Sequence, residues 1–223
     1  WGEIRGALMD ASGSGEDDRL LHRLLFFSDA VFAIVLTLLV LELRPPVTHD
    51  GASVSAVLAG MVPHFVAFGL SFAVVAVYWA AHMSTLRRLA HFDWPTAWAN
   101  VAFLAPVCLT PFASSLLGEG RFGAGAWMFY AYVLIATSMA NLLLWLTASR
   151  GAGRLMGGLS GREQAYRGLR AATPGLTFAG SLLALHFNQL QLAQFCWILI
   201  PLILIFLERA VKPRAARPAP TPP

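Results

Sequence analysis

An aspartate lies inside an apolar run that is long enough to cross a lipid bilayer. The run reads RLLFFSDAVFAIVLTLLVLEL over residues 23–43, and its carboxylate is Asp29. An ionisable side chain at membrane depth is costly, so it usually faces protein or water and has a partner. Two kinds of chemistry are therefore open for Asp29: a site for a cation or a proton, or a carboxylate that holds neighbouring helices together by hydrogen bonds.

Helical periodicity separates Asp29 from a stripe of bulky aliphatic side chains. If Ile34 is set at zero and each residue advances the helix by about 100°, Leu38 falls at about 40° and Leu41 at about −20°. Thr37 lies at the edge of this stripe, at about −60°, whereas Asp29 lies at about 220°. We therefore expect Asp29 to point into protein, away from the stripe.

The composition is that of a polytopic membrane protein. Of the 223 residues, 57% are hydrophobic and 13% are charged, whereas a soluble domain carries roughly 25% charged residues. The first 20 residues hold five acids, so we expect no cleavable secretory signal. Because residue 1 is Trp, we expect the natural start to be missing or altered.

Six segments reach the length of about 20 apolar residues that a spanning helix needs. The first covers residues 20–43 and ends at Arg44-Pro45-Pro46, because proline cannot continue a helix. The second, 53–86, is overlong, which predicts a tilt or a protruding end, with Pro63 as a point of bending. The others cover 94–117, 123–148, 164–186 and 190–210, and we expect Thr173-Pro174-Gly175 to interrupt the fifth.

The basic residues predict how the six spans are oriented, since cytoplasmic loops are enriched in Lys and Arg. With both termini inside, all of the 16 Lys and Arg except Arg44 and Arg121 fall on the cytoplasmic side. The net charge of +4 is thus a topology signal, and we expect no nucleic-acid partner. The predicted organisation is a cytoplasmic N-terminal segment (1–19), a transmembrane domain (20–211) and a disordered proline-rich tail (212–223).

The first span begins with a recognisable signature. Arg23-x-x-x-Phe27-Ser28-Asp29, followed by an apolar run that ends in Leu-Leu-Val-Leu-Glu, resembles the first helix of the transmembrane protein 175 family. These are the lysosomal-type potassium channels, and the layout here resembles their bacterial, single-repeat form. The six spans with both ends inside agree with this resemblance.

The resemblance implies an all-α membrane protein that assembles as a homotetramer of six-helix subunits, with the pore lined by the first helix. It implies that rings of aliphatic side chains form the pore constriction, and these fall here on Ile34, Leu38 and Leu41. Thr37 matches the position where family members present a hydroxyl to the cation near the constriction.

The resemblance also assigns a role to the signature residues. Arg23, Phe27, Ser28 and Asp29 match the motif that ties the pore helix to its surroundings, so we expect Asp29 to anchor this helix outside the ion path. His82, in the cytosolic half of span 2, is a candidate hydrogen-bond partner of Asp29 or Ser28, and a core histidine without a special role is an equal alternative. Asn100 and Asn141 are expected to join helices by hydrogen bonds.

Physical chemistry narrows the expected mechanism. The chain has no Thr-Val-Gly-Tyr-Gly segment, which excludes the usual carbonyl filter, whereas hydrophobic constrictions can gate by dewetting. Potassium holds its water less tightly than sodium, so we expect a leak-like channel in the cell membrane that favours potassium weakly. No span carries a regular arginine series, so a voltage sensor is not expected. One such helix cannot enclose a pore, so function requires an oligomer.

Other functional classes are weaker readings of this sequence. An enzyme would need a catalytic cluster, and the chain has neither a His-Glu-x-x-His motif nor a nucleophile elbow. We therefore expect no enzymatic activity, no cofactor and no metal beyond the permeating potassium.

Secondary transporters usually show inverted repeats and broken helices. A cation- or proton-coupled transporter is the alternative, because span 5 suggests a break although no repeat is apparent. A proton-permeable channel is a variant of the first reading.

Overall fold

The computed structural model describes residues 2–45, 53–150, 161–187 and 189–193, with 202, 203, 206 and 209. Over these residues the chain is helical and contains no strand, as expected for an all-α protein. The helices are α1 (Gly2–Leu41), α2 (Val54–Gly60), α3 (Val62–Leu86), α4 (Trp94–Cys108), α5 (Thr110–Gly118), α6 (Gly123–Ala148) and α8 (Gly161–His186).

Four segments of the described chain are long and apolar enough to cross a membrane. They are Gly15–Leu41, Val62–Leu86, Trp94–Gly118 and Gly123–Ala148, which correspond to the first four predicted spans. The fifth predicted span forms α8, which is not among them and carries Arg162, Glu163, Arg167 and Arg170 in its first half. The sixth, 190–210, lies mostly outside the described residues.

Prolines divide two of the predicted spans. The overlong second span is split at Met61 into α2 and α3, with Pro63 in the first turn of α3. The third predicted span is present as one segment, Trp94–Gly118, but it consists of two helices: α4 ends at Cys108 and α5 begins at Thr110, with Pro111 in its first turn. Proline fits a first turn because its missing N–H would have no helical partner there.

The predicted interruption at Pro174 is wrong, because α8 continues through it. Helices can tolerate an internal proline where a neighbouring helix packs against them. Two hydroxyls next to the proline bond within α8: Thr173 Oγ1 donates to the Leu169 carbonyl at 2.8 Å, and Thr177 Oγ1 donates to the Thr173 carbonyl at 2.9 Å. Gly175 lies so close to α6 that an added Cβ would stand 2.9 Å from Ser138 Cβ. Packing against α6 therefore outweighs the local preference for a break.

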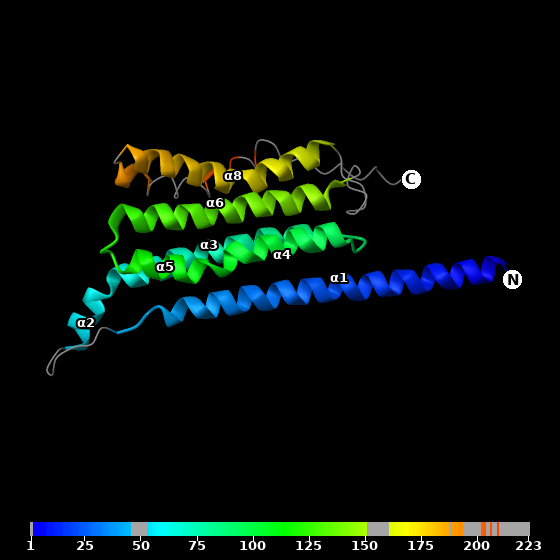
Figure 1. Cartoon of the computed structure of the whole chain (residues 1–223), viewed down its shortest axis with the longest axis horizontal. Helices are drawn as coiled ribbons and strands as arrows, with labels where there is room; N and C mark the ends of the chain where they lie inside the picture. Colours follow the sequence, from blue (N-terminus) through cyan, green and yellow to red (C-terminus); the bar gives the residue numbers. More distant parts are fainter. Residues whose placement is uncertain are drawn as a thin grey trace, which may run out of the picture.

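The helices lie roughly parallel in successive layers (Figure 1). Helix α1 forms one side of the bundle and packs against α3, α4 and α5, followed by α6 and then α8. The N-terminal part of α1 runs well past the ends of the other helices, so residues 2–19 of the predicted N-terminal segment belong to the first helix. No described helix covers the outer side of α1.

Aromatic and aliphatic side chains fill the core between α1, α3, α4 and α6. From α1, Phe32, Val35 and Leu39 are each at most 2% exposed. Two hydroxyl pairs join α3 to α6 within this apolar surrounding: Ser71 Oγ with Tyr130 Oη at 2.8 Å, and Tyr78 Oη with Ser138 Oγ at 2.5 Å. Such buried pairs fix the register of one helix against the next, because an unpaired hydroxyl would be costly there.

Candidate functional site

The two sides of α1 differ sharply in what covers them. Phe32, Val35 and Leu39 are buried against the bundle. Ile34 and Leu41 are each 57% exposed and Leu38 is 40% exposed. The residues that periodicity placed on one stripe therefore share the uncovered side of the helix. A contiguous apolar surface of this kind marks a place where another protein surface or lipid packs.

Thr37 adds one polar atom to the edge of this stripe. Its Oγ1 donates to the Ile34 carbonyl of the same helix at 2.8 Å. A hydroxyl has one proton and two acceptor lone pairs. Since the proton is used within the helix, the oxygen of this exposed side chain presents its lone pairs outward. The stripe thus offers aliphatic groups together with an oxygen that could contact a cation.

Asp29 lies away from the stripe and contacts α3. Its Oδ1 accepts a hydrogen bond of 2.9 Å from Trp79 Nε1, and the side chain is half-buried. No ion pair links Asp29 to a basic residue within the described part of the chain. The contact with Trp79 agrees with the expectation that Asp29 points into protein, and it ties the middle of α1 to α3.

A second connection runs through three helices in the buried interior. His82 Nε2 lies 2.6 Å from Asn100 Oδ1, and Asn100 Nδ2 donates to Ser28 Oγ at 2.9 Å. Ser28 Oγ in turn donates to the Leu24 carbonyl at 2.9 Å. His82, Asn100 and Ser28 are at most 1% exposed. His82 Nδ1 has no partner, so the pattern fits a neutral imidazole with its proton on Nε2.

The expected direct bond from His82 to Asp29 or Ser28 is therefore not present. Asn100 stands between His82 and Ser28, and Asp29 bonds Trp79 instead. Asn100 does join helices, as predicted. Asn141, which was expected to act in the same way, makes no side-chain hydrogen bond within the described residues. The roles of Ser28, Asp29 and His82 in function stay predictions.

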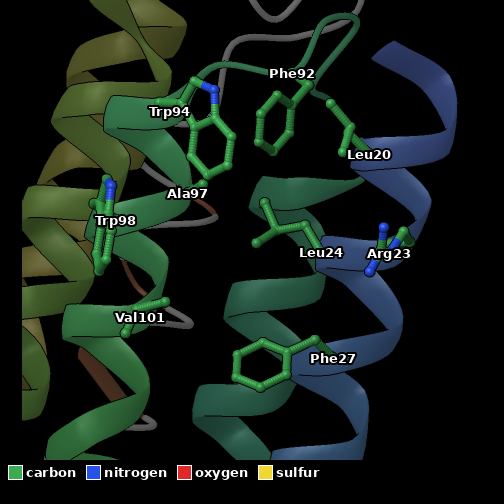
Figure 2. Close-up of a pocket in the computed structure, with 9 residues that line it drawn as sticks. All are labelled: Leu20, Arg23, Leu24, Phe27, Phe92, Trp94, Ala97, Trp98 and Val101. Carbon is green, nitrogen blue, oxygen red and sulfur yellow. The ribbon is translucent and has the colours of Figure 1, made fainter. Parts of the chain in front are cut away.

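A pocket of about 360 Å³ opens between α1 and α4. In Figure 2, Leu24 and Phe27 point from α1 toward α4, while Phe92 and Trp94 stand at one end of the pocket and Arg23 is set apart from them. Arg23 has no acidic partner within the described residues. The predicted motif residues Arg23 and Phe27 thus belong to this pocket and not to the Asn100 connection. The pocket is lined by Leu20, Arg23, Leu24, Phe27, Phe92, Trp94, Ala97, Trp98 and Val101.

Sequence reasoning did not predict this pocket. Trp94 and Trp98 read as side chains that sit at a membrane interface, and nothing in the sequence connects residues 20–27 with 92–101. The pocket exists only because α1 and α4 pack side by side.

Known proteins are similar to this chain, above all over the helices that form the site. Residues 23–111 match a family model described as endosomal/lysosomal potassium channel TMEM175. A protein of Chryseobacterium sp. named as a potassium channel is 33% identical over 122 residues, which cover 55% of this chain and 62% of that protein. The endosomal/lysosomal proton channel TMEM175 of Bos taurus is 28% identical over 226 residues, covering 87% of this chain and 47% of its own length.

A solved structure also has a similar fold. The crystal structure of a lysosomal potassium-selective channel TMEM175 homolog from Chamaesiphon minutus matches with a TM-score of 0.66 and 25% identity. The match covers 87% of this chain and 100% of that chain. Against the Chryseobacterium relative, in contrast, the chain spans 62% of the relative's length. The segment matched by the family model contains the whole signature of residues 23–29, together with α3 and α4.

Proposed function

Because residues 23–111 match the TMEM175 family model, we propose that the chain is a member of this family and a subunit of a potassium-permeable channel whose pore is lined by α1. One observation carries this proposal. The side of α1 that no described helix covers presents Ile34, Leu38 and Leu41, with the Thr37 oxygen at its edge. An apolar stripe on a spanning helix would need no polar atom if lipid alone covered it. If the stripes of several subunits face one another, they could narrow a water-filled path between the subunits.

The proposed constriction consists of three aliphatic rings. Ile34, Leu38 and Leu41 are spaced over roughly 10 Å of helix axis. Hydrophobic rings restrict ions by dewetting, so a passing ion must shed part of its water. This step is easier for potassium than for sodium, which supports a weak preference for potassium. The Thr37 oxygen, less than one turn from Ile34, would contact the partly dehydrated ion.

The proposed assembly is a homotetramer of six-span subunits in the cell membrane, with both termini in the cytoplasm. The C-terminal ends of α3 and α6 lie at the same end of the bundle (Figure 1). Arg87 and Arg88 follow α3, and Arg150 follows α6. Arg44 follows the C-terminal end of α1, which lies at the other end of the bundle. The positive-inside rule then supports a cytoplasmic location for the first group. In this proposal, residues 1–19 form the cytoplasmic segment, 20–211 the channel domain and 212–223 the proline-rich tail.

A secondary transporter is the second candidate, because the structure contains broken helices. The chain breaks at Met61, between α2 and α3, and at Leu109, between α4 and α5. Transporters often place binding sites at such breaks.

The relative from Bos taurus is named a proton channel, which supports proton permeation as a variant of the channel proposal.

The proposal is tested by reversal potential in planar bilayers with purified protein, potassium on one side and sodium on the other. We expect single-channel currents that reverse toward the potassium potential and increase with driving force without saturation. A flux that saturates, or that needs a gradient of a second ion, would favour the transporter. A reversal potential that follows the proton gradient would favour the proton variant.

Asp29 should matter for the helix and not for ion selection. Asp29→Asn keeps an oxygen that can accept the Trp79 Nε1 hydrogen bond, and it removes only the charge. Because Asp29 lies away from the stripe, we expect the potassium-to-sodium permeability ratio to change by less than about twofold, equivalent to about 0.4 kcal/mol. The ratio is measured under the same bi-ionic conditions. A tenfold change would place the carboxylate in the ion path.

A further inference from the structure

The pocket between α1 and α4 has a matching side chain on the opposite flank of α1. We propose that Phe26 of one subunit fills the α1–α4 pocket of the next subunit around the pore. This inference rests on the proposed function, because it uses a ring of α1 helices. It adds a specific contact that would hold the ring together.

The pocket is suited to an aromatic group. Its lining is apolar and aromatic apart from Arg23, and its volume of about 360 Å³ exceeds that of one side chain. Phe27 and Trp98 are 51% and 67% exposed, so the described chain leaves part of the pocket wall uncovered. Interfaces are commonly anchored by an aromatic side chain that enters a pocket of this kind.

Phe26 is available to enter such a pocket. It is 73% exposed, the highest exposure among the large hydrophobic side chains over residues 15–41 of α1. Its ring stacks on that of His22 in the same helix, at 6.5 Å between centroids. Because the described helices leave most of this side chain exposed, lipid or another subunit would have to cover it.

The arrangement of α1 favours another subunit. With Ile34 directed at the pore axis, Phe26 projects about 80° to one side and Leu24, in the pocket, about 80° to the other. Rotation about the pore axis does not change the position of a residue along that axis. Phe26 of one subunit therefore lies at the same depth as residues 23–27 of the next subunit. A contact between two different surfaces closes into a ring when the rotation permits.

Photo-crosslinking tests the contact in the full chain. Phe26→p-benzoylphenylalanine keeps the aromatic ring and forms a covalent bond with the group that it touches on illumination. We expect crosslinks between chains that map to residues 92–101, while the same replacement at Phe187, 66% exposed beyond the end of α8, gives none there. Phe26→Ala is expected to lower the oligomer fraction, measured by native mass spectrometry, by about tenfold or more, whereas Phe187→Ala leaves it unchanged.

The outcomes separate this inference from the proposed channel. Crosslinks to phospholipid alone, or to another part of the neighbouring subunit, would overturn the Phe26 contact. If the unmodified protein in the same preparation is oligomeric and conducts potassium, the channel proposal still stands. An unmodified protein that is monomeric and passes no current would overturn the channel itself, and with it the ring that the contact requires.

Discussion

Ile34→Asn is expected to lose most of the preference for potassium over sodium and to conduct about tenfold more current. Asparagine has as many side-chain heavy atoms as isoleucine but hydrogen-bonds water, so a ring of asparagines would keep the proposed constriction wet. A barrier lowered by about 1.4 kcal/mol corresponds to a tenfold faster rate. Single-channel conductance and reversal potential are measured in planar bilayers with potassium on one side and sodium on the other.

Val40 offers a matched control for this experiment. It is also β-branched, it lies on the same helix, and its exposure of 51% is close to the 57% of Ile34. It projects about 120° away from Ile34, so Val40→Asn adds the same amide outside the proposed ion path. We expect Val40→Asn to leave both conductance and selectivity as they are. If the two variants behave alike, or if Ile34→Asn changes nothing, α1 does not line the pore through this stripe.

Sequence periodicity predicted the stripe because a helix carries its side chains at a constant angle. That argument needs only the spacing of Ile34, Leu38 and Leu41, and the structure places them on one uncovered side. The fourth span, 123–148, was predicted with the same bounds as α6, since it is a continuous apolar run without proline. Local properties of the chain were sufficient in both cases.

Prolines were harder to interpret from the sequence. Pro63 and Pro111 each stand at the beginning of a new helix, whereas Pro106 and Pro174 are accommodated inside α4 and α8. Because all four residues are prolines, their local chemistry cannot explain why two begin a helix and two lie inside one. The difference depends on which neighbouring groups satisfy the backbone and how closely another helix packs, and both are tertiary properties.

The connection between His82 and Ser28 shows the same limit within the site. Polar residues at depth in apolar spans were expected to find partners, and Ser28, His82 and Asn100 do, whereas Asn141 does not within the described residues. The sequence could not show that Asn100, 72 residues from Ser28, would stand between them. It also could not show which helix would approach Asp29, because the contact with Trp79 joins residues that are 50 positions apart.

Asn100→Leu is expected to destabilise the protein by about 2 kcal/mol. Leucine has a similar branched shape, but it removes the bonds to His82 Nε2 and Ser28 Oγ together. The imidazole N–H would then be buried without a partner beside Phe103, whose ring is stacked 5.2 Å from that of His82. Ser28 would lose less, because its hydroxyl still donates to the Leu24 carbonyl. Unfolding is followed by helical circular dichroism during titration with a denaturing detergent.

Two further variants make the cause of this loss testable. Asn141→Leu makes the same chemical change at a buried asparagine of α6 that has no side-chain hydrogen bond in the described structure, so we expect less than about 0.5 kcal/mol. His82→Phe combined with Asn100→Leu removes both partners, which can be nearly neutral when the shape is kept. The double variant should therefore recover much of the stability that Asn100→Leu loses. If it is instead the least stable of the three, the loss comes from packing around α1 and not from the unpaired imidazole.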